Sequence, residues 1–212
     1  MARQILIVAA TEAEIEPLNT HFGDIKPFDV LITGVGMVAT AYALGSHFAV
    51  KKYSLVINLG IAGSFDRDIS LGEVVEVIAD ELSELGAEND ELFMPIAQLG
   101  FGESRYLASS ALRYHTQSVK LKTANAITVN TVHGNEASIQ KIAARLTPQL
   151  ESMEGAAFFY ACQKVNIPCI QIRAVSNYVE KRNRDNWQIG LAIKNLNNFA
   201  IALLEELTSG KR

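Results

Sequence analysis

The chain has 212 residues, of which 49% are hydrophobic and 20% charged, and its formal net charge is −4. This length and apolar content suffice for one sizeable core, so we expect a single domain over residues 1–212. A slightly acidic chain lacks the basic surface with which nucleic-acid-binding proteins neutralise phosphates, so nucleic acid is excluded as a partner.

The chain also carries no recognisable membrane or redox signal. The first apolar run, Ile5 to Ala10, is followed at once by the acidic Glu12, and no run approaches the roughly 18 residues of a membrane span. Cys162 and Cys169 offer neither a disulfide framework nor metal-ligand spacing. We therefore expect a cytoplasmic protein with no membrane partner and no metal.

Short apolar, β-branched segments alternate with longer amphipathic ones, which predicts an α/β fold with a central, mostly parallel or mixed twisted sheet flanked by helices. The predicted strands cover residues 4–10, 29–33, 54–59, 73–79, 125–130 and 169–175. The predicted helices cover residues 12–22, 37–50, 136–147, 154–166 and 187–208. Residues 83–104 are acidic and then glycine-rich; no regular element is predicted there, and such segments are often lids or binding loops.

Two glycine turns follow predicted strands. Gly34 begins a Gly-x-Gly-x-x-Ala turn, but the next strand ends without the carboxylate that a dinucleotide fold places about 20 residues later, so a nicotinamide cofactor is disfavoured. The second turn spans residues 58–63. Together the turns indicate either a ligand crevice at the carboxyl edge of the sheet or tight packing of helix on strand.

Two glutamates begin helices. Glu14 fits a capping box with Thr11, which by itself accounts for its position, but it also lies at the end of the first strand. Glu154 is read as a first-turn acid behind an N-cap at Ser152, and the small residues after it leave room for a ligand at the helix start.

The last apolar strand carries an arginine. Arg173 is costly to bury without a partner such as a carboxylate, and Asn177 follows it at the carboxyl edge of the sheet. A rim with two carboxylates, an amide and two glycine turns indicates a hydrolase or transferase pocket. Nothing narrower follows from the geometry.

The residues of this rim belong to motifs whose order and spacing resemble the nucleoside phosphorylase/nucleosidase family over nearly the whole chain. The family motifs are residues 5–14, 34–36, 58–63, 71–73, 152–157 and 173–177. Residues 128–134, 151–160 and 176–184 resemble the futalosine hydrolase branch most closely. The resemblance implies the nucleoside phosphorylase fold, a small-molecule nucleoside substrate, a homodimer or higher homo-oligomer, and neither cofactor nor metal.

The resemblance also implies roles for particular residues. Glu14 matches the acid that activates the attacking water, and Glu154 the carboxylate that grips the ribose hydroxyls. Met153 matches the residue packed on the sugar, and Arg173 an arginine that supports the base-binding loop. The remaining substrate contacts fall on Gly34, Gly60, Ile61, Ala62 and Val132.

Two departures from the family pattern bear on the substrate. Asn177 stands where nucleosidases specific for adenine carry an aspartate, and an amide suits a 6-oxopurine because it donates to O6 or N7 and accepts from N1–H. Ile61 replaces a serine of the adenine enzymes.

The only arginines before Arg105 are Arg3 and Arg67, and neither lies in a glycine turn. A bidentate phosphate clamp is therefore lacking, and water is the expected nucleophile.

These expectations favour hydrolysis of futalosine, or its aminodeoxy analogue, to hypoxanthine within menaquinone biosynthesis. The aryl carboxylate of that substrate needs a cationic partner, for which Lys181, Arg182, Arg184 and His133 are candidates. The alternatives are a methylthioadenosine/adenosylhomocysteine nucleosidase, which Asn177 disfavours, and a nucleoside-binding protein without turnover, which the pair of glutamates disfavours.

Overall fold

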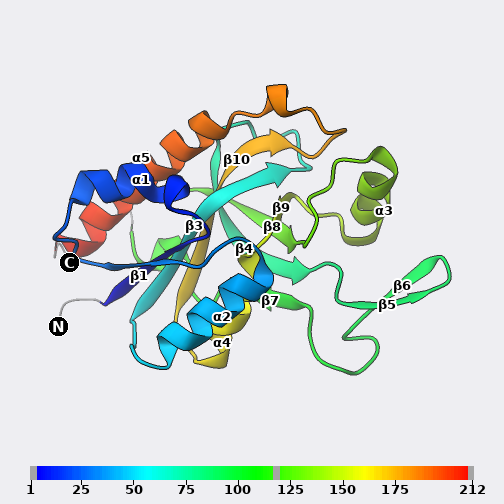
Figure 1. Ribbon diagram of the computed structural model, residues 1–212, viewed down its shortest axis with the longest axis horizontal. Helices are drawn as coiled ribbons and strands as arrows, with labels where there is room; N and C mark the ends of the chain where they lie inside the picture. Colours follow the sequence, from blue (N-terminus) through cyan, green and yellow to red (C-terminus); the bar gives the residue numbers. More distant parts are fainter. Residues whose placement is uncertain (1–3, 117–119, 210–212) are drawn as a thin grey trace.

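An eight-stranded twisted sheet forms the centre of the protein, and helices cover both of its faces (Figure 1). The computed structural model describes residues 4–116 and 120–209. The sheet strands are β1 (Ile5–Ala9), β2 (Asp29–Ile32), β3 (Leu55–Ser64), β4 (Val74–Leu82), β7 (Arg105–Leu107), β8 (Lys122–Thr128), β9 (Leu150–Ser152) and β10 (Cys169–Tyr178). The α-helices are α1 (Glu12–Phe22), α2 (Met37–Phe48), α3 (Glu136–Leu146), α4 (Gly155–Lys164) and α5 (Ile189–Thr208). Short 3₁₀ turns lie at Leu112–Tyr114 and Arg184–Asn186.

The sheet is mixed. β3 lies between β1 and β10 and is parallel to both, while β10 pairs antiparallel with β4. β4 continues through the parallel strand β8 to the short β9, which returns to β3. The strand order therefore closes on itself. β1, β3 and β10 are parallel, so their carboxyl ends lie at the same edge, whereas β8 runs with β4 and opposite to β10.

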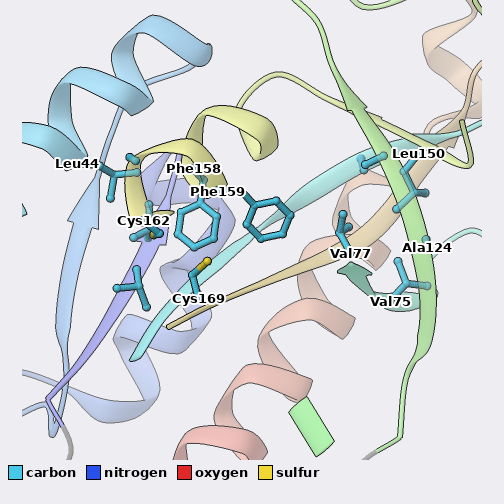
Figure 2. Packing of buried hydrophobic residues seen from close by; sticks show 14 of the residues in the cluster. Leu44, Val75, Val77, Ala124, Leu150, Phe158, Phe159, Cys162 and Cys169 are labelled. Atoms are coloured by element: carbon cyan, nitrogen blue, oxygen red, sulfur yellow. The ribbon is translucent and has the colours of Figure 1, made fainter. Parts of the chain in front are cut away.

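Alternate residues of each strand point to opposite helical layers, as the two-residue period of a strand requires. On β1 and β3, Ile7 and Ile57 belong to the core beneath α1 and α5, whereas Val8 and Val56 belong to the core beneath α2 and α4. The second core is shown in Figure 2, where Phe158 and Phe159 of α4 pack against the sheet. Both faces of the inner strands are buried, which is why their sequences are mostly apolar; Asn58 of β3 and Gln171 and Arg173 of β10 are buried polar exceptions.

The predicted elements are largely confirmed, with corrections at the strand ends. The predicted strands end at residues 59 and 79, but β3 extends to Ser64 and β4 to Leu82, because both remain paired with their neighbours beyond the predicted ends. The segment 83–104, for which no regular element is predicted, contains the hairpin β5 (Gly86–Asn89) and β6 (Leu92–Pro95), which lies beside α3 in Figure 1. Within residues 4–116 and 120–209, no helix is both long enough and apolar enough to cross a membrane.

Candidate active site

Glu14 lies in the first turn of α1, directly above the end of β1. Its Oε2 accepts hydrogen bonds of 3.0 Å from the backbone N–H and the hydroxyl of Thr11, so the predicted capping box is present. Its Oε1 accepts from the backbone N–H of Ile61, 3.1 Å away on β3. The same carboxylate therefore caps its own helix and reaches the middle of the sheet.

A buried asparagine holds the helix that carries Glu14. Asn197 of α5 is 1% exposed and donates to the backbone carbonyl of Glu14 at 2.8 Å, while its Oδ1 accepts from the N–H of Leu18 at 2.9 Å. An amide satisfied on both sides fixes α1 against α5. The signal in the sequence is one polar residue inside the apolar stripe of α5.

Glu154 occupies the N-cap position of α4 and not its first turn. The prediction of an N-cap at Ser152 is wrong, because residues 150–152 pair as strand β9. The Glu154 side chain makes no capping hydrogen bond; its Oε1 instead accepts from the N–H of Gly36 at 3.0 Å. Glu154 is therefore directed away from its own helix and toward the turn that precedes α2.

Arg173 stands between the two carboxylates and is 1% exposed. Its Nη2 donates to Oδ1 of Asn58 at 2.7 Å and lies 4.0 Å from Oε2 of Glu154. On its other side, Nη1 lies over Gly60, next to Oε1 of Glu14. The expected carboxylate partner is thus present, but the direct hydrogen bonds of the guanidinium go to amide oxygens.

The two glycine motifs contribute in different ways. Residues 58–63 form the second half of β3 and not a turn, and Gly60 is required there because a Cβ would overlap Nη1 of Arg173. Gly34 and Gly36 do form the turn between β2 and α2, with φ values of +83° and +98° that favour glycine. Gly36, which the site prediction did not include, is the residue that contacts Glu154.

Asn177 lies farther along the same pair of strands. It is paired with Gly63, three residues beyond Gly60, or roughly 10 Å along the strand. Its Oδ1 accepts from the hydroxyl of Ser176 at 2.8 Å, and one N–H of its amide donates to the carbonyl of Tyr178 at 3.1 Å. The amide therefore keeps a second N–H and a second lone pair for a ligand.

The other predicted substrate contacts are placed around these groups. Ile61 and Ala62 lie on β3 between the level of Glu14 and that of Asn177. Met153 is half-buried between β9 and Glu154. Val132 lies in the loop after β8, where it is 37% exposed. The adjacent His133 connects this loop to the buried carboxylate of Glu151.

A buried polar network that the motifs did not reveal lies behind Arg173. Gln171 accepts from Nε of Arg173 at 2.9 Å and donates to Asp80 at 3.1 Å. Asp80 also accepts from the hydroxyl of Thr128 at 2.8 Å. Burial raises the pKa of the Asp80 carboxyl to about 6, although these hydrogen bonds and the charge of Arg173 act in the opposite direction. The available signal was a polar residue inside each of two apolar strands.

An apolar hollow lies beside this site and not over it. Its volume is about 860 Å³, and it opens between α2, α4 and the segment around Phe101. Met37 and Ala157 line it, one residue after Gly36 and two residues after Gly155. We place the chemistry at the carboxylates, where charge and hydrogen-bonding groups converge, and the hollow forms an apolar flank.

Neither a phosphate clamp nor a metal centre is evident among the described residues. Arg67 is held by Glu180 at 2.6 Å and stacks on the ring of Tyr178, while Arg3 lies outside the described residues. The part of the chain that the structure covers contains no group of three or more His, Cys, Asp or Glu side chains that could hold a metal ion.

Comparison with known proteins identifies the family. Residues 9–208 match the model of the phosphorylase superfamily, and the chain belongs to that family. A futalosine hydrolase from Streptomyces coelicolor is 31% identical over 191 residues, covering 87% of this chain and 81% of the relative.

Two solved structures show the same fold. The adenine complex of a 5'-methylthioadenosine/S-adenosylhomocysteine nucleosidase from Colwellia psychrerythraea has a TM-score of 0.81 at 22% identity, covering 98% of this chain and 96% of that one. A futalosine hydrolase mutant from Helicobacter pylori has a TM-score of 0.81 at 18% identity, covering 97% and 100%. The expected family and fold are confirmed, as is the expectation of an enzyme of this family.

Proposed function

We propose that this protein hydrolyses the N-glycosidic bond of futalosine, a 6-oxopurine nucleoside, and releases hypoxanthine and dehypoxanthine futalosine. The observation that carries the proposal is a buried guanidinium, Arg173, set between the carboxylates of Glu14 and Glu154 at a glycine that leaves room for it. The relative from S. coelicolor, which is named futalosine hydrolase, supports this choice of nucleoside. In this proposal the reaction serves menaquinone biosynthesis and uses neither metal nor cofactor.

The proposed chemistry assigns different tasks to the two carboxylates. When the bond between C1' and the purine nitrogen breaks, its electron pair leaves with the purine and the sugar becomes cationic. Glu14 orients a water molecule and takes one of its protons as the oxygen bonds to C1'. Glu154 accepts hydrogen bonds from the ribose hydroxyls, and both carboxylates favour the cationic sugar. The departing purine takes a proton from solvent, and Glu14 releases to solvent the proton that it took from water, so the products are free base and free sugar.

Asn177 is the proposed reader of the purine edge. Its free N–H donates to O6 or N7, and its free lone pair accepts from N1–H, which a 6-oxopurine has and an adenine lacks. The separation of roughly 10 Å between Gly60 and Gly63 along β3 sets the base reader apart from the hydrolytic groups. That spacing suits a substrate whose sugar lies at one end and whose base lies at the other.

Water is the proposed nucleophile because the cations near the site are already engaged. Arg173 donates hydrogen bonds to the side-chain amides of Gln171 and Asn58, and Arg67 donates to Glu180. Neither guanidinium therefore offers a free pair of N–H donors for bidentate binding of phosphate. Phosphorolysis would need such a clamp to bind and orient the anion.

The test is to incubate the protein with futalosine, inosine or methylthioadenosine, with and without phosphate, and to separate the products by chromatography. We expect hypoxanthine from futalosine at the same rate in phosphate-free buffer, with the free sugar as co-product. A sugar 1-phosphate, or a rate that increases with phosphate, would contradict hydrolysis. Faster release of adenine than of hypoxanthine would contradict the assigned substrate.

We further propose that the protein is a homodimer paired through α2 and the segment around Phe101. Val38 and Tyr42 of α2 are each 77% exposed and Phe101 is 80% exposed, an apolar surface that a second copy would cover. Sedimentation equilibrium should give twice the chain mass for the wild type and a lower mass for Tyr42→Asp. A monomeric wild type would contradict this part of the proposal.

A further inference from the structure

Asp80 of β4 is a fully buried carboxylate that lies behind the site and makes no contact with a reacting group in the proposed chemistry. Its Oδ1 accepts from the hydroxyl of Thr128 at 2.8 Å, and its Oδ2 accepts from Nε2 of Gln171 at 3.1 Å. An ionised carboxylate only accepts hydrogen bonds, so both neighbours are compelled to donate.

One branch of contacts leads from Asp80 to the guanidinium. The amide of Gln171 donates to Asp80 and accepts from Nε of Arg173 at 2.9 Å. Arginine has donors only, so the two ends of the Gln171 amide are prescribed by its two neighbours. A rotated amide would place donor against donor at Arg173 and acceptor against acceptor at Asp80.

The other branch leads from Asp80 to the helix that follows Glu154. The Thr128 hydroxyl donates to Asp80 and accepts from the backbone N–H of Ala156 at 2.7 Å, in the first turn of α4. Gly155 packs so closely that a Cβ there would overlap both the Asp80 carboxylate and the Gln171 amide. The start of α4, and with it Glu154, therefore rests on the same carboxylate.

We propose that Asp80 is a positioning residue. As a fixed acceptor it sets the direction of the Gln171 amide and of the Thr128 hydroxyl, and through them it holds Arg173 and the start of α4 in register beside Glu14 and Glu154. The proposal rests on the proposed function, since it assigns Asp80 to the geometry of that same site.

Substitutions at positions 80 and 171 can disrupt the order of donors and acceptors in this chain of hydrogen bonds and then restore it. Asp80→Asn replaces one of the two acceptor oxygens with a donor, so either Gln171 or Thr128 faces a donor in place of its acceptor. Gln171→Glu introduces a carboxylate that faces Asp80. In the double variant, the new amide at position 80 donates to the new carboxylate at position 171, which still accepts from Arg173. The double variant also keeps the number of charges and nearly the same volume.

The kcat for futalosine should depend on whether donors face acceptors in the hydrogen bonds that join Asp80, Gln171 and Arg173. A small misplacement of catalytic groups costs on the order of 10²-fold in rate, so we expect each single variant to lose about 10- to 100-fold in kcat with a smaller change in KM. The double variant should regain most of kcat. Glu76→Gln is the matched control, because Glu76 is a buried carboxylate of the same strand that accepts from Leu112, away from the site; its kcat should be unchanged.

The Nε–H signal of Arg173 in a ¹H–¹⁵N spectrum gives a second readout that needs no turnover, and Arg173→Lys assigns it. We expect a downfield, slowly exchanging signal in the wild type that is shifted or lost in each single variant and restored in the double variant. A double variant no better than the singles in both readouts would overturn the proposal. If the wild type released no base from any nucleoside, the proposed function would fail, and the Arg173 signal would still decide whether Asp80 orients this network.

Discussion

Oε1 of Glu14 accepts a hydrogen bond from the backbone N–H of Ile61 at 3.1 Å, although 47 residues separate them in the chain. Capping of α1 alone does not require a contact between the Glu14 side chain and β3. The contact directs one carboxylate oxygen to the place where Arg173 passes over Gly60, while the other oxygen serves Thr11. The two roles use different oxygens, so they can be separated by substitution.

Glu14→Gln should reduce turnover by about 10²–10⁴-fold, the usual effect of removing a positioned general base, with a small change in melting temperature. An amide retains one acceptor for the cap but cannot take a proton from water. Base release and thermal unfolding measure the two effects. Glu12→Gln is the control, because Glu12 is an exposed acid in the same helical turn and should leave turnover unchanged. Near-wild-type turnover in Glu14→Gln would show that Glu14 is only a cap.

Asn177→Asp should damage cleavage of futalosine more than that of methylthioadenosine. The substitution is nearly isosteric, but a carboxylate facing O6 places acceptor against acceptor, whereas the amino group of adenine tolerates it. Sites that read one hydrogen-bonding edge discriminate by up to roughly 10⁴-fold; we expect about 10- to 10³-fold, because water and loop shifts compensate in part. The measurement is the ratio of kcat/KM for the two nucleosides in both proteins. An unchanged ratio would mean that Asn177 does not read the base.

Gly60→Ala should nearly abolish activity, because the added Cβ would overlap Nη1 of Arg173, which has buried amides around it and little room to move. Gly190→Ala is a matched control on α5, outside the proposed dimer surface. A Cβ at position 190 meets no atom within 4 Å, so that change should stabilise the protein by up to about 0.5–1 kcal/mol through helix propensity and leave kcat unchanged. Full activity of Gly60→Ala would contradict the placement of Arg173.

The stability difference between the wild type and Asp80→Asn should depend on pH in a defined window. Burial raises the pKa of Asp80 from its ordinary 3.8 to about 6, so between these values the folded protein holds a proton that the unfolded chain has released. The contribution of this group to stability is therefore complete below about pH 4, decreases as the pH rises to about 6, and is constant above. Urea unfolding of both proteins across this range measures the difference. An increase of the difference with pH would give the opposite sign and contradict the raised pKa.

The helical and strand periods and the glycine turn at Gly34 could be predicted from the sequence, because each depends on residues that are close together in the chain. The stripe on α5, the capping box of Thr11 and Glu14, and the apolar inner strands each depend on residues a few positions apart. The order of the motifs pointed to the family, and their residue types indicated which chemistry the pocket could support.

Only the tertiary structure decided which of these residues meet. Glu154 looked like an ordinary first-turn acid, and its contacts with Gly36 and Arg173 depend on β2, α4 and β10 coming together. The strands β9 and β7 have three residues each and are stabilised by their neighbours and not by any period of their own. Asp80 could be noticed in the sequence only as a polar residue in an apolar strand. Its role depends on which donors the fold places around it, and those donors come from β8 and β10.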